Sequence, residues 1–314
     1  MALTVDDVDR FKAFMPRLEA IAYRLLGSAS DAEDAVQDTF LRWQAADRDR
    51  IEVPEAWLTK VLTNLCLNQL TSARARRETY VGQWLPEPLL PGDPMLGPAE
   101  TAEQRESVSY AVLALMERLS PDERVVYVLR EAFGYPHRKI AEIIDITESA
   151  AQQILHRARK HVAEGRARTE VDEAAARRIV EEFIEAATSG RTEPLVRLLT
   201  ADAVSIGDGG GKVPARTKPF EGAVAVATFL RGLFKPGKAK RALAGGSPGV
   251  HLTTANNGPA LVAVVDGRVI GVMCLEITAE GIAAIRAQAN PDKLERATRR
   301  WAASDHGEPL LNLY

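Results

Sequence analysis

The sequence of 314 residues has little net charge of either sign, two cysteines and no long apolar run. Its formal net charge of −3 lacks the basic excess that is typical of a protein that binds nucleic acid tightly on its own. Any contact with DNA must therefore come from local patches or from binding within a larger complex. The apolar and charged fractions, 46% and 26%, are those of an ordinary globular protein. The length predicts two or three domains.

The two cysteines, Cys66 and Cys274, are far apart and lie in apolar surroundings. One structural disulfide is an alternative, but two buried reduced thiols in a cytosolic protein are favoured. The N-terminal residues lack a basic segment followed by an apolar run, so no secretory signal is predicted. No apolar run approaches the roughly 20 residues that span a bilayer. We therefore expect a cytoplasmic protein without membrane contact, and the cysteines and five histidines form no pattern that predicts a metal site or a cofactor.

Helical periodicity fills the first 80 or so residues. Gly27 is expected to end the first helix, and Asp31 to cap a second helix that runs to about Trp43. A third helix is predicted to begin after Pro54 and to end in a basic stretch.

The segment from Trp84 to Pro98 contains five prolines and two glycines in fifteen residues, which predicts an extended connector. Leu85 and Leu89 are among six large apolar residues in this segment, and they would be costly to leave in water. We therefore expect the connector to lie along a surface groove.

Residues 100 to about 165 return to helical periodicity. One helix is predicted from about Thr101 to Leu119, and the next begins at Ser120-Pro121. Two short helices, about Pro136 to Ile144 and Glu148 to His161, are separated by a short turn and form a helix–turn–helix.

The remainder of the chain combines two helices with a series of short β-rich runs, and the dipeptide Asp266-Gly267 is a strong hairpin signal. This order of elements predicts an α+β domain with a curled antiparallel sheet.

The outward face of the second helix of the helix–turn–helix carries amide and basic side chains that can contact base edges and phosphates in a major groove. The alternative is a structural hairpin with a solvated polar face, but DNA binding is favoured because the face is amide-rich and basic. The residues concerned are Ser149, Gln152, Gln153, His156, Arg157 and Lys160.

Two weaker signals lie near the N-terminus. Asp34 and Asp38 stand one turn apart on the polar side of the second helix, where a solvated face is the usual interpretation. The helix after Pro54 carries Trp57 and a polar side with Lys60, which suits stacking and backbone contact with single-stranded DNA.

Taken together, these segments resemble an extracytoplasmic-function sigma factor over about residues 5–165. DAEDAVQDTFLRW resembles the segment that docks on the clamp helices of the largest subunit of RNA polymerase, EAWLTKVLTNLCLNQL resembles the segment that opens and reads the −10 element, and residues 120–162 resemble the −35 module. The resemblance implies RNA polymerase core, including its beta flap, and promoter DNA as partners. It places Asn64 beside a flipped −10 base, with the loop at about Ala46–Glu55 as the other wall of the base pocket.

The resemblance assigns the remaining contacts in two groups. Core polymerase would be bound by Asp31, Asp34, Gln37 and Asp38. The −10 DNA would be bound by Trp57, Lys60, Asn64, Asn68 and Arg74.

The C-terminal part resembles the cone-shaped SnoaL-like α+β fold. Three short strings, Trp84–Pro88 (WLPEP), Asp208–Lys212 (DGGGK) and Asn290–Leu294 (NPDKL), resemble signatures of the sigma-factor subgroup that carries such a domain. In that subgroup the fused domain is a built-in regulator. Gly209, Gly210 and Gly211 permit a tight loop that is expected to place Lys212 beside Asp208. The regulatory interdomain residues implied are Trp84, Leu85, Pro86, Glu87, Pro88, Asp208, Lys212, Asn290, Pro291, Asp292, Lys293 and Leu294.

We therefore predict a multidomain protein: two all-α sigma-factor domains, the second a helix–turn–helix, followed by an α+β cone-shaped SnoaL-like domain. The expected boundaries are 1–80, a connector at 81–99, 100–168 and 169–314. The regulatory domain is expected to pack against the N-terminal domain and the connector, and a small-molecule ligand of it is left open.

Two alternatives from other classes remain at this point. One is a stand-alone, ligand-responsive helix–turn–helix regulator, which would have no reason to carry the acidic helix. The other is an isomerase or cyclase activity in the SnoaL-like domain, for which Asp202, Asp208 and His251 are the available acid–base candidates. Because these three show no coherent spacing, we expect no catalytic residues.

Overall fold

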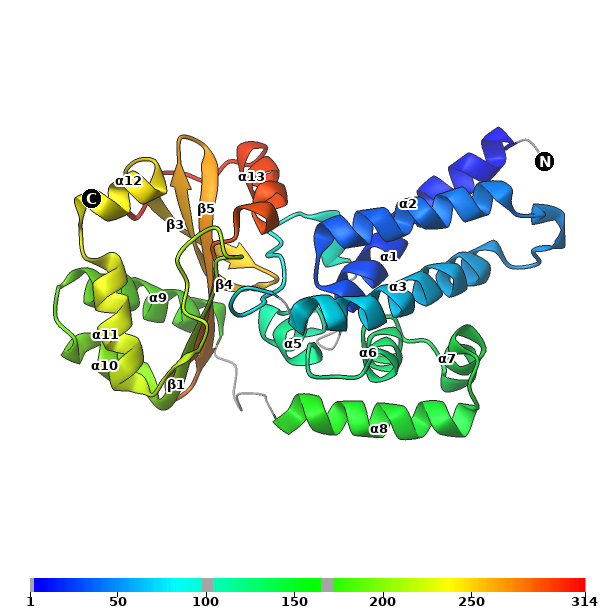
Figure 1. Ribbon diagram of the computed structural model, residues 1–314, viewed down its shortest axis with the longest axis horizontal. Helices are drawn as coiled ribbons and strands as arrows, with labels where there is room; N and C mark the ends of the chain where they lie inside the picture. The colour runs from blue at the N-terminus through cyan, green and yellow to red at the C-terminus, as the bar shows by residue number, and fades with distance from the viewer. Residues whose placement is uncertain (1–2, 79, 98–103, 105, 165–171, 314) are drawn as a thin grey trace. The chain divides into compact units, whose positions relative to one another are not determined.

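The computed structural model describes residues 3–78, 80–97, 104, 106–164 and 172–313, and for residues 73–78, 164 and 173 it describes the backbone alone (Figure 1). The chain separates into two compact units. The first unit consists of Met1–Thr79 and Gly92–Arg166, and the second of Tyr80–Pro91 and Ala167–Tyr314. Helices make up the first unit, whereas every strand found in the described residues belongs to the second.

Three long helices open the first unit. Gly27 ends the first of them in the left-handed conformation, with φ of 68°, as predicted. The second begins earlier than expected, because Ser28 rather than Asp31 is its N-cap and accepts a hydrogen bond from the Asp31 amide. The helices are α1 (Val5–Leu26), α2 (Ala29–Ala45) and α3 (Pro54–Glu78).

Shorter helices form the rest of the first unit. The single helix expected from Thr101 to Leu119 is wrong, because the chain turns at Ser107–Val108 and Ser109 caps a new, seven-residue helix. Residues 101–103 and 105 lie outside the described residues. The Ser120 capping box and Pro121 start the next helix as predicted. The elements are α5 (Tyr110–Met116), α6 (Pro121–Tyr127) with a π-helical continuation (Val128–Ala132), α7 (His137–Ile144) and α8 (Glu148–Glu164).

A buried arginine ties α1 to the later part of this unit. Arg24 is fully buried, and its guanidinium donates to the Leu96 carbonyl at 2.7 Å and to the Ser107 hydroxyl at 3.1 Å. Burial lowers the pKa of Arg24 to about 10, so the side chain still carries its charge at neutral pH. The charge is stabilised by these oxygens, and losing them would leave a buried cation unsatisfied.

The second unit is built on one seven-stranded sheet with the order β2-β1-β6-β5-β4-β3-β7. Asp266 and Gly267, both with positive φ, form the predicted hairpin turn between β4 and β5. The expectation of an antiparallel sheet is wrong at one place, because β1 pairs in parallel with β6. The strands are β1 (Leu199–Asp208), β2 (Phe220–Glu221), β3 (Gly249–Ala255), β4 (Gly258–Val265), β5 (Arg268–Thr278), β6 (Gly281–Gln288) and β7 (Leu311–Asn312).

Helices lie on both sides of this sheet (Figure 1). On one side, Phe183 and Leu230 from the helices pack with Leu275 and Ile285 from the strands in one apolar core. On the other side lie α13, which contacts β5, and the connector residues described below. The helices are α9 (Glu173–Thr188), α10 (Glu193–Leu198), α11 (Ala223–Phe234), α12 (Lys238–Ala244) and α13 (Glu295–Ala302).

Both cysteines are free and buried, Cys66 in the first unit and Cys274 in the second. Burial raises the pKa of Cys66 above its ordinary value and that of Cys274 to about 12. Neither thiol is therefore a reactive thiolate near neutral pH. Among the described helices none is long and apolar enough to cross a membrane.

Gly97 is expected to be intolerant of a side chain. Its φ of +66° and ψ of −155° form a combination that is essentially restricted to glycine, and a Cβ would lie 2.6 Å from the Cβ of Ala20. Gly97→Ala should therefore lower the free energy of unfolding by about 2–4 kcal/mol, since backbone strain adds to overpacking. Gly134 has nearly the same φ, +69°, but a Cβ there would meet no atom within 4 Å. Gly134→Ala should thus cost only the strain, about 1–2 kcal/mol. Urea unfolding of the two variants measures the difference, and equal losses of stability would show that the approach to Ala20 is unimportant.

Candidate functional sites

The helix–turn–helix presents the polar face that the sequence predicts. Asp145, with φ of 59°, makes the turn in the left-handed conformation, and Thr147 accepts a hydrogen bond from the Ala150 amide at the start of α8. The apolar residues Ala151 and Leu155 are buried in the same helix. The exposed face holds all six predicted DNA-binding residues, Ser149, Gln152, Gln153, His156, Arg157 and Lys160.

Helix α2 divides into a buried apolar side and an exposed acidic side. Val36 and Trp43 are buried, and the Trp43 indole donates to the Asp7 carbonyl of α1 at 3.1 Å. The orientation of the helix is therefore determined by packing, and its polar residues face outward. The exposed set contains all four predicted polymerase-binding residues, Asp31, Asp34, Gln37 and Asp38.

A pocket of about 510 Å³ lies where the loop after α2 meets the start of α3. Trp57 contributes one wall, and its ring is packed 5.7 Å from that of Trp43. The pocket therefore combines an aromatic surface with polar groups, which is the combination that holds an unstacked base. The remaining lining residues are Ala46, Asp47, Arg50, Ile51, Glu52 and Val53.

The other predicted −10 residues continue along α3 rather than lining this pocket. Lys60, Asn64 and Asn68 follow Trp57 at three- and four-residue intervals, so they share one side of the helix. Asn64 is half-buried and is not one of the residues that line the pocket. Arg74 belongs to α3, but its side chain lies outside the described residues.

In this conformation α3 also contacts the helix–turn–helix within the first unit. The Lys60 ammonium donates to the Glu142 carbonyl of α7 at 2.7 Å, and the hydroxyls of Thr59 and Tyr135 are 3.2 Å apart. Lys60, which is predicted to bind −10 DNA, is therefore hydrogen-bonded to α7, the helix that precedes the predicted −35 helix α8.

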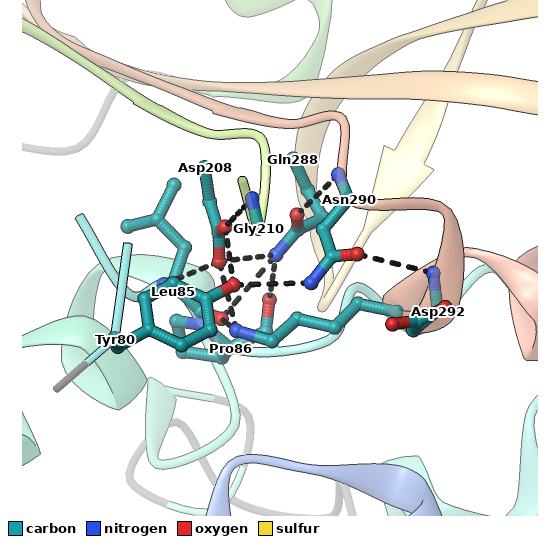
Figure 2. A network of polar contacts seen from close by, with 9 residues as sticks. Tyr80, Leu85, Pro86, Asp208, Gly210, Gln288, Asn290 and Asp292 are labelled. Atoms are coloured by element: carbon teal, nitrogen blue, oxygen red, sulfur yellow. Dashed lines mark hydrogen bonds and ion pairs between the residues drawn. The ribbon is translucent and has the colours of Figure 1, made fainter. Parts of the chain in front are cut away.

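An extensive polar network of the second unit is built around Asp208, at the end of β1 (Figure 2). Its carboxylate is fully buried and accepts five hydrogen bonds. The donors are the Tyr80 hydroxyl at 2.6 Å, the Leu85 amide at 2.9 Å, the Gly210 amide at 3.0 Å, the Gln288 amide nitrogen at 3.2 Å and the Lys293 ammonium at 2.8 Å. We call these six residues the connector latch.

The connector latch joins three of the segments singled out in the sequence. Lys293 also donates to the Leu85 carbonyl at 2.7 Å, and its ammonium lies 4.1 Å from the centre of the Trp84 ring. Burial and the hydrogen bond to Asp208 raise the pKa of Tyr80 above its ordinary value, so its hydroxyl remains a donor. The network neutralises Asp208 with one cation and satisfies its remaining lone pairs.

The expectation that Lys212 lies beside Asp208 is wrong. Lys212 pairs with Asp292 at 2.7 Å in an exposed ion pair, and Lys293 is the cation that Asp208 uses. The glycine loop does make the predicted tight turn, since Gly210 and Gly211 both have positive φ. It brings the Gly210 amide to the Asp208 carboxylate.

The rest of the connector follows the second unit as far as Pro91. Leu89 exchanges two hydrogen bonds with Asn256, at 2.9 and 3.0 Å, and Arg300 donates to the Pro91 carbonyl at 2.8 Å. The side chains of residues 85–90 are buried, Pro86, Glu87 and Pro88 among them. The prediction that this apolar segment is covered by a surface is therefore confirmed. Leu294 is buried as well, whereas Pro291 is exposed.

Sequence reasoning missed Tyr80 and Gln288, which complete the network. The Gln288 amide nitrogen reaches the carbonyls of Leu85 and Pro86, and the Asn290 amide nitrogen donates to the Tyr80 hydroxyl at 3.0 Å. Gln288 lies two residues before Asn290 at the end of a predicted strand. That position was the signal in the sequence that could have predicted its part in the network.

The acid–base candidates of the second unit do not converge. Asp202 is exposed near the start of β1, and Asp208 is committed to the connector latch. His251 is buried on β3 against the Trp301 ring, four strand positions away from β1. Three strands, β6, β5 and β4, lie between β1 and β3, and Asp208 and His251 are not hydrogen-bonded to each other in the described residues, so they do not form an acid–base pair. Across the described residues, no group of three or more His, Cys, Asp or Glu side chains is placed to hold a metal ion.

Comparison with known proteins identifies the class and then the family. The model of Sigma-70 region 2 matches residues 10–76, and that of Sigma-70 region 4 matches residues 109–162. The chain is therefore a protein of the sigma-70 class, with region 2 on α1–α3 and region 4 on α5–α8. More narrowly, the chain belongs to the extracytoplasmic-function (ECF) RNA polymerase sigma factors, whose members are transcription regulators.

Two relatives from Mycobacterium tuberculosis show the extent of the similarity. The chain is 39% identical to the ECF RNA polymerase sigma factor SigJ over 228 residues, which are 72% of this chain and 73% of SigJ. It is 31% identical to the probable ECF RNA polymerase sigma factor SigI over 296 residues, which are 91% and 93% of the two chains. The crystal structure of SigJ matches with a TM-score of 0.70 at 31% identity and covers 91% of this chain and 97% of its own. The C-terminal domain therefore has the SnoaL-like fold of SigJ.

Removing the charge of Asp208 tests the connector latch. Asp208→Asn leaves Lys293 as an uncompensated buried cation and should lower the free energy of unfolding of the second unit by about 3–5 kcal/mol. It should also release residues 80–91, which limited proteolysis followed by mass spectrometry would detect as new cleavage in this segment. The double variant D208N/K293M removes both charges and should recover part of the stability. The latch would be refuted if the single variant resisted both urea and protease as well as the wild type does.

Proposed function

We propose that this chain binds the RNA polymerase core through the acidic face of α2 and directs the enzyme to specific promoters. The acidic face carries the proposal, because four exposed polar residues lie on one side of a helix whose other side is buried. A stand-alone repressor has no use for such a face. The partner surface is the pair of clamp helices of the largest subunit, and region 4 contacts the beta flap.

The pocket after α2 captures a flipped −10 base in this proposal. Unstacking a base costs a few kcal/mol, which stacking on Trp57 and polar contacts along the loop can offset. Lys60, Asn64, Asn68 and Arg74 then follow the displaced strand along α3.

Helix α8 enters the major groove of the −35 element. Gln152, Gln153 and Arg157 contact base edges, while Ser149, His156 and Lys160 contact base edges or phosphates. The chemistry of RNA synthesis belongs to the polymerase, and this chain supplies position and strand capture.

The SnoaL-like domain regulates these steps by holding the connector. Residues 80–91 are part of the covalent path between region 2 and region 4, and they belong to the second unit. A connector held there is not free to extend, so the Lys60–Glu142 contact between the two regions is retained. Release of the connector latch then lets the regions separate onto the two promoter elements. This domain acts here as a regulator that works inside the cytoplasm, without any reaction of its own.

Neutralising the acidic face tests the proposed function. D34A/D38A should weaken binding to core polymerase at least tenfold, which is about 1.4 kcal/mol, because two interface charges are removed. Thermal stability should not change, since both side chains are exposed. The matched control is D9A/D305A, which removes two exposed carboxylates elsewhere.

Binding is measured by fluorescence anisotropy of the labelled chain titrated with core enzyme, and run-off transcription is measured in parallel. Equal affinity of D34A/D38A and the control for core would refute the proposed docking face. Tight, sequence-specific DNA binding by the chain without polymerase, together with no transcription in its presence, would favour the stand-alone regulator instead.

A further inference from the structure

The SnoaL-like domain contains a strongly basic stretch in a chain with an excess of acids. The whole sequence has 43 acidic and 40 basic residues, yet from Lys212 to Val265 there are eight Lys or Arg residues and one acid, Glu221. This stretch includes α11 and α12, and its cations, apart from Lys212, take no part in the sites described above.

The cations of this stretch gather on the exposed side of α11 and α12. Arg231 and Lys235 follow Val224 and Thr228 along one exposed stripe, since these positions are three or four residues apart. Lys238 and Arg241 are exposed on α12, none of whose residues is buried. We call Arg231, Lys235, Lys238 and Arg241 the basic face.

Arg216 extends the basic face toward the start of α11. Its guanidinium lies 4.6 Å from the centre of the Phe220 ring, and Phe220 stacks on Phe229 of α11 at 4.3 Å. Lys240, by contrast, is turned inward, because its ammonium donates to the carbonyls of Gly232, Leu233 and Lys235 at the end of α11. Lys240 therefore caps a helix and is not part of the basic face.

Neighbouring acids do not neutralise these cations. Besides Asp208 of the connector latch, the elements packed against α11 carry Glu181, Glu182 and Glu185 on α9, Glu193 on α10, Asp202 on β1 and Glu221 on β2. Glu181 pairs with Arg177, Glu193 lies 3.8 Å from Arg191, and Asp202 accepts from Thr200. Within the described ranges, no carboxylate lies within ion-pair distance of any residue of the basic face. The charge of the face is therefore available to an external anion.

We propose that the basic face binds the phosphate backbone of the DNA on which the polymerase is assembled, without reading its sequence. The proposal rests on the proposed function, because it is promoter binding that brings DNA to this domain. At 1.5 Å per residue, Arg231 and Lys235 are about 6 Å apart along the helix axis, and Lys238 and Arg241 about 4.5 Å. DNA carries a phosphate about every 3.4 Å of axis on each strand, so each cation can face a phosphate of its own.

Other polyanions fit this face less well. Helices that lie on anionic membranes insert aromatic or leucine side chains, and the large apolar side chains exposed in the described part of the chain include no Trp, Tyr or Phe. Leu233 and Leu243 are the two leucines exposed near the basic face, on separate short helices. A backbone of regularly spaced phosphates matches a row of cations without requiring an apolar anchor.

The salt dependence of DNA binding tests this proposal. R231Q/K235Q/K238Q removes three charges, and the slope of log K against log salt concentration should become shallower by up to about 2.7, at about 0.9 for each phosphate that is no longer neutralised. The control variant R178Q/R268Q/R299Q removes three exposed arginines on other elements of the same domain and should keep the wild-type slope. Circular dichroism melting should be the same for both, because all six side chains are exposed.

The affinity is measured twice: with holoenzyme on promoter DNA, and with the full chain alone on a duplex that lacks a promoter. Equal slopes for the basic-face variant and the control in both formats would overturn the proposal. The proposal would also be overturned if the wild type bound phosphatidylserine vesicles or an acidic peptide, the basic-face variant lost that binding, and the salt slope of its DNA binding stayed unchanged. Failure of the proposed function is a separate result, since wild-type holoenzyme would then show no preference for promoter DNA.

Discussion

The buried carboxylate of Asp208 is the constraint on which the organisation of the chain depends. An ionised carboxylate without water is stable only when it is paired and hydrogen-bonded, and Asp208 meets this requirement with donors from the connector, the glycine loop, β6 and the segment after β6. Because two of the five donors, Tyr80 and Leu85, come from residues 80–91, the charge cannot be fully satisfied by residues 167–314 alone. The connector is for that reason part of the core of this domain.

Because Asp208 and the connector depend on each other, truncation of the chain disturbs both. Cutting the chain after region 4 would remove Asp208 and the sheet, and would leave Leu85, Leu89 and Leu90 without the surface that buries them. The activity of a truncated chain would therefore reflect two changes, the exposure of an apolar segment and the loss of the regulatory domain. Point variants in the connector latch separate these effects, since they leave the sheet in place.

Local signals in the sequence predict much of the fold, and long-range pairings account for the errors. Gly27 and Asp266-Gly267 mark a helix end and a hairpin correctly, because left-handed backbone is a property of the residue itself. Ser28 and Asp31 are both good caps, and periodicity alone does not separate them. The parallel pairing of β1 with β6 joins strands that are far apart in the sequence, and no local pattern encodes it.

The same division holds for the sites. The faces of α2 and α8 follow from helical spacing, since burial of one side leaves the other exposed. The partner of Asp208 could not be found in this way, because Lys212 is near in sequence while Lys293 is near in space. The family resemblance places Asn64 and the loop after α2 in one base pocket, yet Asn64 lies farther along α3 and does not line the pocket.

The most direct test of this account is run-off transcription by core polymerase with the full-length chain and with its D208N variant, on promoters selected by the wild-type holoenzyme. The account predicts promoter-specific transcripts from both chains, with more from the variant, because a released connector lets regions 2 and 4 separate. Fewer transcripts from a variant that binds core as tightly as the wild type would contradict the restraining role assigned to the connector latch.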